Sequence, residues 1–118
     1  GHTFAHAIEK VSNNTIRHGE AVAMGIAAAT DLSARMGYCD HDLKNRIDLI
    51  LDKVGLPNRI PAALSPGSIL DTMRKDKKRL AQSLRLVLPI KVGQVFVADD
   101  IDNRDILKTL EAMSGPGR

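Results

Sequence analysis

Three of the four histidines in the chain lie close together near its start, at His2, His6 and His18. Histidine is the side chain that most often binds metal ions in proteins, and it exchanges protons near neutral pH. His2 and His6 are four residues apart, so on a helix both rings would lie on one face, about 6 Å from each other. A chain reversal before His18 would bring the third ring to the same place. The spacing therefore suits metal binding and proton transfer.

A metal site needs more than the histidines. Two imidazoles and one carboxylate make a catalytic zinc site with one open position for substrate. Glu9 and Glu20 are the nearby carboxylates, and each is a candidate ligand or a hydrogen-bond partner of a histidine. Spacing alone does not say which two of the three histidines bind metal. It is equally compatible with histidines and glutamates on the polar face of a helix.

A second group of residues that could do chemistry is the basic segment 74–79, Arg-Lys-Asp-Lys-Lys-Arg. A lysine ammonium is a compact charge that suits a phosphate group. Within it, Lys75, Asp76, Lys77 and Lys78 form the candidate binding group, and we expect these four to lie at the end of a helix and before a strand. The plain alternative is a solvated, charged turn.

Composition limits the fold that must position these residues. The 118 residues suit one domain, and 43% of them are hydrophobic, but only 3% are aromatic and none is Trp. Such a core must be aliphatic, which favours close-packed helices. The net charge of +3 with few aromatic side chains argues against nucleic-acid binding. The single cysteine, Cys39, excludes an internal disulfide, and no apolar run is long enough for a membrane span.

The apolar spacing predicts a mainly α fold, a helical bundle-like domain with one small β-hairpin. Helices are expected over 3–11, over 18–36 with Gly37 as the C-terminal cap, and over 42–54 with Asp40 as the N-cap and Gly55 at the close. Two more are expected, one from Ser65 or Ser68 to about Arg74 and one through Met113 with Asp102 as the N-cap. Strands are expected over 84–88 and 94–97, with 89–93 as their connection and 114–118 as a loose tail.

Helix faces can be predicted as well. Residues 21–29 are small and apolar on every side, which indicates a closely packed helix that would self-associate if its neighbours were missing. Side chains of two other helices are expected to point inward: Leu43, Ile47, Ile50, Leu51 and Val54 in one, and Ile106, Leu107 and Leu110 in the other.

Four segments of the chain resemble the C-terminal domain of the 3-dehydroquinate synthases. They are GHTFAHAIE (1–9), RHGEAVAMG (17–25), DKK (76–78) and LRLVLPIKVG (84–93), in the family's order and at similar separations. The first motif of the family usually has glycine where this chain has Ala5. The resemblance extends over essentially the whole sequence.

The resemblance implies roles for individual residues. His2 and His18 match the family's two metal-binding histidines, and the third ligand is a glutamate that precedes the first motif. His6 matches an active-site histidine that is implicated in proton transfer. Lys77 or Lys78 matches a lysine that contacts the substrate phosphate. The chain starts at Gly1 without Met, which predicts a fragment whose site is completed by preceding residues.

The resemblance also implies a reaction. The family converts 3-deoxy-D-arabino-heptulosonate 7-phosphate to 3-dehydroquinate and phosphate in the shikimate pathway, using NAD held by an N-terminal domain and Zn²⁺ or Co²⁺. It implies a cytoplasmic homodimer as the full-length enzyme, and an inactive isolated chain. Alternatives are a related sugar-phosphate cyclase, a metal-dependent polyol dehydrogenase, or a helical module without enzymatic activity.

Overall fold

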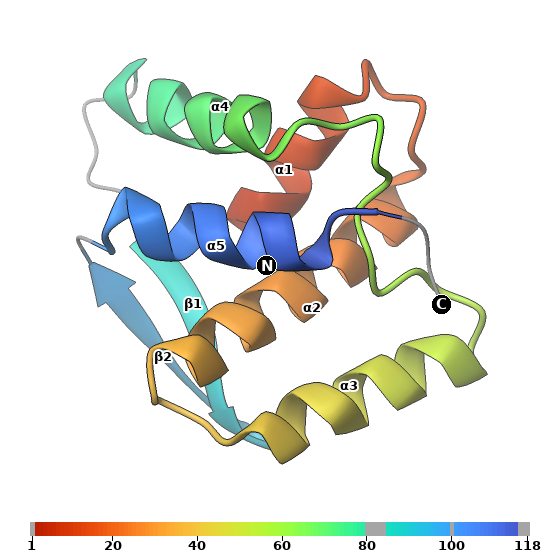
Figure 1. Ribbon diagram of the computed structural model, residues 1–118, viewed down its shortest axis with the longest axis vertical. Coiled ribbons are helices and arrows are strands. Elements are labelled where there is room, and N and C mark those ends of the chain that lie inside the picture. The colour runs from red at the N-terminus through yellow and green to blue at the C-terminus, as the bar shows by residue number, and fades with distance from the viewer. Residues whose placement is uncertain (1, 80–84, 100, 116–118) are drawn as a thin grey trace.

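The computed structural model describes residues 2–79, 85–99 and 101–115, and it leaves the side chains of His2, Lys78 and Arg79 undescribed. The elements follow in the order α1 (His2–Val11), α2 (His18–Arg35), α3 (His41–Lys53), α4 (Pro66–Arg79), β1 (Arg85–Lys91), β2 (Gln94–Asp99) and α5 (Asn103–Met113). Helices dominate, and the two strands form one antiparallel hairpin (Figure 1). The predicted mainly α fold with one hairpin is confirmed.

Helix α2 forms the centre of the core. It packs against α1, α3, α5 and strand β1 (Figure 1). Its small side chains allow these neighbours to approach closely, and Ala21, Ala27 and Ala28 are fully buried. The expected buried helix is confirmed. Its neighbours belong to this chain, and Ile26 is the residue of the apolar stretch that remains exposed, at 39%.

The ends of α1, α2 and α3 are set by local backbone chemistry. Asn13 and Asn14 take positive φ values of 54° and 61°, which stop α1 and reverse the chain before α2. Gly37 and Gly55 also have positive φ, and in both cases two backbone N–H groups bond back to the last helical turn, as in the Schellman motif. The Asp40 carboxylate accepts from the N–H of Leu43 at 3.1 Å and caps α3.

Helix α3 buries a narrower face than its sequence predicts. Leu43 and Leu51 are buried and Ile47 is half-buried, but Ile50 and Val54 are 54% and 63% exposed. The prediction is wrong for the last two. Helix α3 packs against α2, and α2 covers the side chains at every fourth position, Leu43, Ile47 and Leu51. Ile50 and Val54 lie beside this row and stay in solvent.

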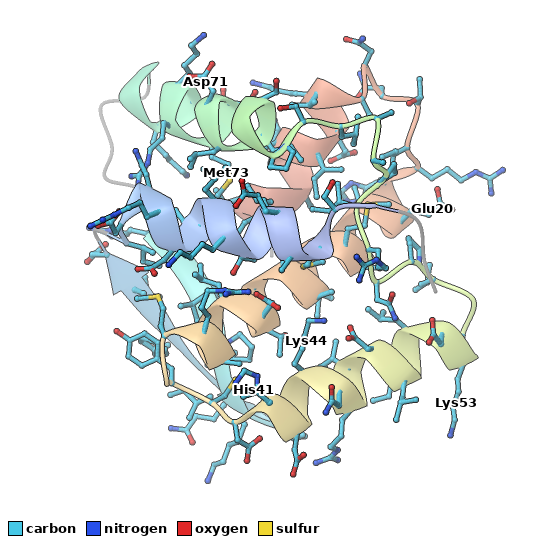
Figure 2. All side chains as sticks on the ribbon, in the orientation of Figure 1. Glu20, His41, Lys44, Lys53, Asp71 and Met73 are labelled. Atoms are coloured by element: carbon cyan, nitrogen blue, oxygen red, sulfur yellow. The ribbon has the colours of Figure 1, made fainter. Side chains whose placement is uncertain are left out.

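Helix α4 is longer than expected. The hydroxyl of Ser65 accepts from the N–H of Ser68, so Ser65 is the residue that caps its start. Figure 2 shows Met73 pointing from α4 toward α5, where it is buried. The helix then continues past Arg74 to Arg79. The predicted end was wrong because lysine and arginine are good helix formers, and Lys75 pairs with Asp71 one turn earlier at 3.0 Å.

The hairpin also differs from its prediction. Strand β1 runs through Pro89 to Lys91, and only Val92 and Gly93 form the turn. Proline fits here because the sheet has two strands and β1 has a free edge, where a missing N–H breaks no ladder bond. Leu86 and Leu88 face α2 and are buried, whereas Val87 is exposed. Leu84, the expected first residue of this strand, lies outside the described residues.

Helix α5 starts at its predicted cap. The Asp102 carboxylate accepts from the N–H of Arg104 at 2.8 Å, and this bond lowers the pKa of the Asp102 carboxyl below its ordinary value. Ile106 and Leu110 are buried as expected, and Leu107 is half-buried. A transmembrane helix needs a long, nearly uncharged apolar stretch, and the helices in the described part of the chain contain none.

The segment after α5 is held to the loop before α4. Ile60 donates its N–H to the carbonyl of Met113 at 2.9 Å, and Gly115 donates to the carbonyl of Ile60 at 3.0 Å. Ile60 and Ser114 thereby form a parallel bridge. The prediction of a loose tail is wrong for Ser114 and Gly115, and residues 116–118 lie outside the described part.

Candidate functional site

His18 and Glu9 are in direct contact. Nδ1 of His18 lies 3.1 Å from Oε2 of Glu9. An ionised carboxylate can only accept hydrogen bonds, so this contact favours the His18 tautomer that has its proton on Nδ1. The His18 side chain is 69% exposed and that of Glu9 is 24% exposed. The imidazole is therefore held at one nitrogen and remains open to solvent around its other atoms.

The break between α1 and α2 produces this contact. The backbone carbonyl of Glu9 accepts from the hydroxyl of Ser12 at 3.0 Å and from the N–H of Asn14 at 2.9 Å. These bonds fix the chain where it leaves α1. The reversal at Asn13 and Asn14 then returns His18, the first residue of α2, beside the end of α1.

One face of α1 carries the other predicted residues. His6 is three residues before Glu9, and His2 is four residues before His6, so all three positions lie on one side of the helix. His6 is exposed, and the side chain of His2 is not described. The structure therefore brings His18 to the α1 face on which the sequence places His2 and His6.

Glu20, the other carboxylate candidate, has a different role. Its Oε1 accepts from the N–H of Arg17 at 3.4 Å, which satisfies a free donor at the start of α2. Glu20 is two residues after His18, and residues at that spacing point away from each other on a helix. His41 lies at the start of α3, well separated from Glu20 in Figure 2. Of the two carboxylates, Glu9 is the one that contacts His18.

The predicted phosphate-binding lysines lie on the last turns of α4, which packs against α1. Asp76, the first residue of the DKK segment, accepts from the ammonium of Lys10 on α1 at 2.8 Å. This pair ties the lysine segment to the helix that carries the histidines. Lys77 is half-buried, and the side chain of Lys78 is not described. The Lys10–Asp76 contact joins residues 66 positions apart, and nothing in the sequence indicated it.

Arg74 belongs to the scaffold. Its Nη2 donates to the carbonyl of Ile101 at 2.7 Å, and its Nε donates to the side chain of Asn103. Both partners lie at the start of α5. The arginine thus joins α4 to α5, although the sequence grouped it with the basic residues of a phosphate site.

The donors fit a zinc ion in their chemistry. A neutral imidazole that is protonated at Nδ1 presents an unprotonated Nε2, the form in which histidine binds metal, and metal-binding histidines usually donate their other N–H to a carboxylate or carbonyl. Within the described ranges, no three His, Cys, Asp or Glu side chains gather closely enough to hold an ion.

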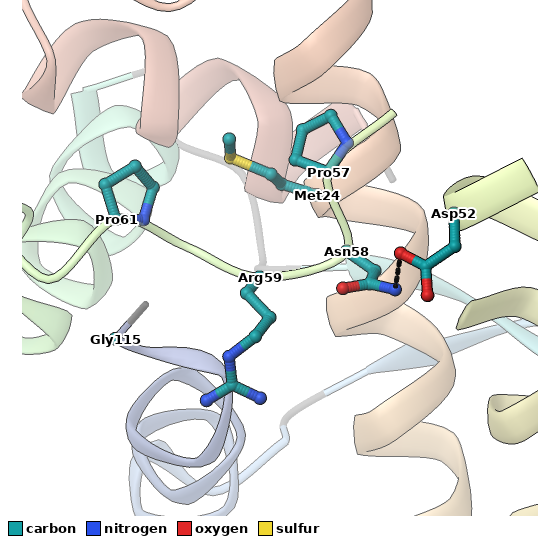
Figure 3. A pocket seen from close by; sticks show the side chains of 7 residues that line it. All are labelled: Met24, Asp52, Pro57, Asn58, Arg59, Pro61 and Gly115. Atoms are coloured by element: carbon teal, nitrogen blue, oxygen red, sulfur yellow. Dashed lines mark hydrogen bonds between the residues drawn. The ribbon is translucent and has the colours of Figure 1, made fainter. Parts of the chain in front are cut away.

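A separate depression of about 350 Å³ lies between α2, α3 and the loop before α4 (Figure 3). Met24, Asp52, Pro57, Asn58, Arg59, Pro61 and Gly115 line it. Two of its polar side chains bond within the fold: Asn58 donates to Asp52 at 3.2 Å, and Nη2 of Arg59 donates to the carbonyl of Ser114 at 3.2 Å, although the buried Nε of Arg59 has no partner among the described residues. None of the predicted site residues lines it.

Comparisons with known sequences all match one family of proteins. A family model described as 3-dehydroquinate synthase C-terminal matches residues 1–79. The 3-dehydroquinate synthase of Xanthomonas campestris pv. campestris (strain 8004) is 41% identical over 116 residues, which cover 93% of this chain and 31% of that protein. The 3-dehydroquinate synthase of Desulforamulus reducens is 42% identical over 111 residues, with the same coverage. The chain thus spans about a third of the length of these relatives.

A solved structure shares the fold. ValA, a 2-epi-5-epi-valiolone synthase from Streptomyces hygroscopicus subsp. jinggangensis 5008, was determined with NAD⁺ and Zn²⁺ bound. It matches with a TM-score of 0.83 at 20% sequence identity, over 95% of this chain and 31% of that one. At this identity the likeness shows the fold alone.

Proposed function

Because the chain belongs to the 3-dehydroquinate synthase C-terminal family, we propose that it is the metal- and substrate-binding part of such an enzyme. The proposed reaction converts 3-deoxy-D-arabino-heptulosonate 7-phosphate to 3-dehydroquinate and phosphate, a step of the shikimate pathway. The observation that carries the proposal is the contact of His18 with Glu9 beside the α1 face of His2 and His6.

The roles we propose follow from this arrangement. His2 and His18 bind the metal through imidazole nitrogens, and a glutamate from outside this chain completes the set. His6, exposed on the same face of α1, transfers a proton at the substrate. Lys77 or Lys78 holds the substrate phosphate by charge. Helices α1 and α4 pack against each other, which supports the proposal that one substrate contacts both the histidines and the lysines.

Two cofactors belong to the proposal. NAD would bind in a separate domain and would take and return a hydride, so that it is not consumed. A zinc or cobalt ion, when bound, supplies positive charge that stabilises a substrate oxygen during hydride transfer. The residues of this chain then orient the substrate, neutralise its phosphate and move a proton, as proteins generally do around a cofactor.

The test uses the longer enzyme that contains this domain together with its nucleotide-binding part, a homodimer in our proposal. Wild-type protein should contain one divalent ion per chain and release phosphate from the heptulosonate substrate with catalytic NAD. His18→Ala should lose the bound metal and the activity, measured by elemental analysis and phosphate release. His41→Ala, at the far end of the fold, is the matched control. Unchanged metal content in His18→Ala would refute the ligand assignment.

The family likeness also allows a related cyclase or a polyol dehydrogenase. Hydride transfer from glycerol to free NAD, without phosphate release, would favour the dehydrogenase. The isolated 118 residues should show no turnover, because the proposed NAD domain and third ligand are not among them. Tight, stoichiometric zinc binding by the isolated chain would favour a non-enzymatic metal module.

A further inference from the structure

We propose that Glu9 is a positioning residue, which sets the tautomer and orientation of His18 so that Nε2 is presented for metal binding. This inference rests on the proposed function for its metal. Its structural part, the hydrogen bond from His18 Nδ1 to Glu9, can be tested without any metal.

The first argument is the difference in exposure between the two side chains. Glu9 is mostly covered, while His18 is 69% exposed and starts a helix without other described side-chain bonds. A ring in that position would otherwise rotate freely about its side-chain bonds. A carboxylate at 3.1 Å fixes one ring nitrogen, and the opposite nitrogen must then point away from Glu9.

The second argument is that the backbone carrying the Glu9 carboxylate is held in place. The Glu9 backbone accepts two hydrogen bonds from the residues that end α1, those of Ser12 and Asn14. The side chain of the next residue, Lys10, forms an ion pair with Asp76 on α4. Within the part of the chain that the structure describes, His18 is the side chain that bonds the Glu9 carboxylate.

The third argument concerns charge and tautomer. Neutral imidazoles in water favour the proton on Nε2, which would block that nitrogen as a ligand. An acceptor at Nδ1 reverses this preference, because the carboxylate stabilises the Nδ1–H form.

The test of the structural part is a ¹⁵N NMR measurement of the histidine side chains in the 118-residue chain, at a pH where imidazoles are neutral. His18 should show a protonated Nδ1 and an unprotonated Nε2. Glu9→Ala should shift His18 to the Nε2–H tautomer, whereas Glu9→Gln should keep much of the Nδ1–H form, because its amide oxygen still accepts. Glu20→Ala removes the other nearby carboxylate and should leave His18 unchanged.

The backbone ¹⁵N–¹H spectrum of each variant reports whether it has folded, and Glu9→Gln serves if Glu9→Ala has not. An Nε2–H tautomer in the wild type, or no response to Glu9→Ala, would overturn the proposal. Either result leaves the family and its reaction untouched.

The metal part is tested in the longer enzyme by zinc competition with a chelator. Loss of a carboxylate partner typically weakens metal affinity by about 10- to 100-fold. Glu9→Ala should fall in that range and Glu9→Gln should be milder, while His18→Ala should abolish binding. If Glu9→Gln loses the metal as completely as His18→Ala, Glu9 is itself a ligand and the positioning role is wrong. If His18→Ala keeps its metal, the proposed function fails instead.

Discussion

Thr109 shows how a single buried hydroxyl can join two helices. It is fully buried on α5, donates to the carboxylate of Asp31 on α2 at 2.9 Å, and accepts from Nε of Arg35 at 3.4 Å. Arg35 also pairs with Asp31 at 3.2 Å. The three side chains form a polar link between α2 and α5.

Replacing Thr109 by valine keeps the shape and removes the link. The half-buried Asp31 and the exposed Arg35 each lose a hydrogen-bond partner, so we expect Thr109→Val to lower the free energy of unfolding by about 1–3 kcal/mol. Urea unfolding of the chain measures it. Thr30→Val is the matched control, because Thr30 is equally buried but its hydroxyl donates to the carbonyl of Ile26 in its own helix. Equal losses in the two variants would contradict a cross-helix role.

At the residue scale the sequence selects candidate residues but does not give their contacts. The cluster of His2, His6 and His18 could be selected by spacing, and so could Glu9 and Glu20. Only the fold shows that their roles differ. The chain reversal brings His18 to Glu9, whereas Glu20 caps the start of α2.

Strand β1 illustrates how one element divides its side chains between core and solvent. Leu88 is fully buried, and its neighbour Val87 is 47% exposed and pairs with Val97 across the hairpin. This alternation is the two-residue period of a strand with one covered face.

Two adjacent truncations test this alternation. Leu88→Ala should lower the free energy of unfolding by about 2–5 kcal/mol, because it removes a buried side chain that faces α2. Val87→Ala should change it by about 1 kcal/mol or less, since only strand preference and an exposed contact are affected. Thermal or urea unfolding of both variants gives the comparison. Similar destabilisation by the two would mean that the hairpin does not present one face to α2.

At the element scale the sequence predicted every described helix and both strands. Boundaries with a chemical signal were also predicted, as at Asp40, Gly37, Gly55 and Asp102. The errors lie where the signal is ambiguous. The charged residues after Arg74 fit a helix or a turn equally well, and Pro89 is a strand breaker except at a sheet edge.

The molecule as a whole is closed by contacts between its middle and its end. Arg59 donates from Nη2 to the carbonyls of Ala112 and Ser114, at 3.3 and 3.2 Å, beside the bridge between Ile60 and Ser114. These bonds satisfy carbonyls at the end of α5 that the helix leaves without partners. Ala112 and Ser114 follow Arg59 by 53 and 55 positions, and the sequence alone could not show that Arg59 bonds to them.

Arg59→Met retains most of the side-chain volume and removes both bonds. We expect the free energy of unfolding to fall by about 1–3 kcal/mol, and the amide protons of Ile60 and Gly115 to exchange faster with solvent. Arg104→Met is the control, because its side chain is 86% exposed and its ion pair with Asp102 lies on the surface. Unchanged exchange at Ile60 and Gly115 would show that the bridge does not depend on Arg59.

The reversal between α1 and α2 bears on the order in which the molecule assembles. Only residues 12–17 separate the two helices, so the loop that brings His18 to Glu9 is short and loses little chain entropy when it closes. Contacts between near neighbours in sequence form faster than distant ones. The bridge between Ile60 and Ser114 closes a much longer loop, so it is expected to form later. The helix pair that carries the histidines is thus suited to nucleate folding, and the imidazole–carboxylate contact can form before the chain has closed around it.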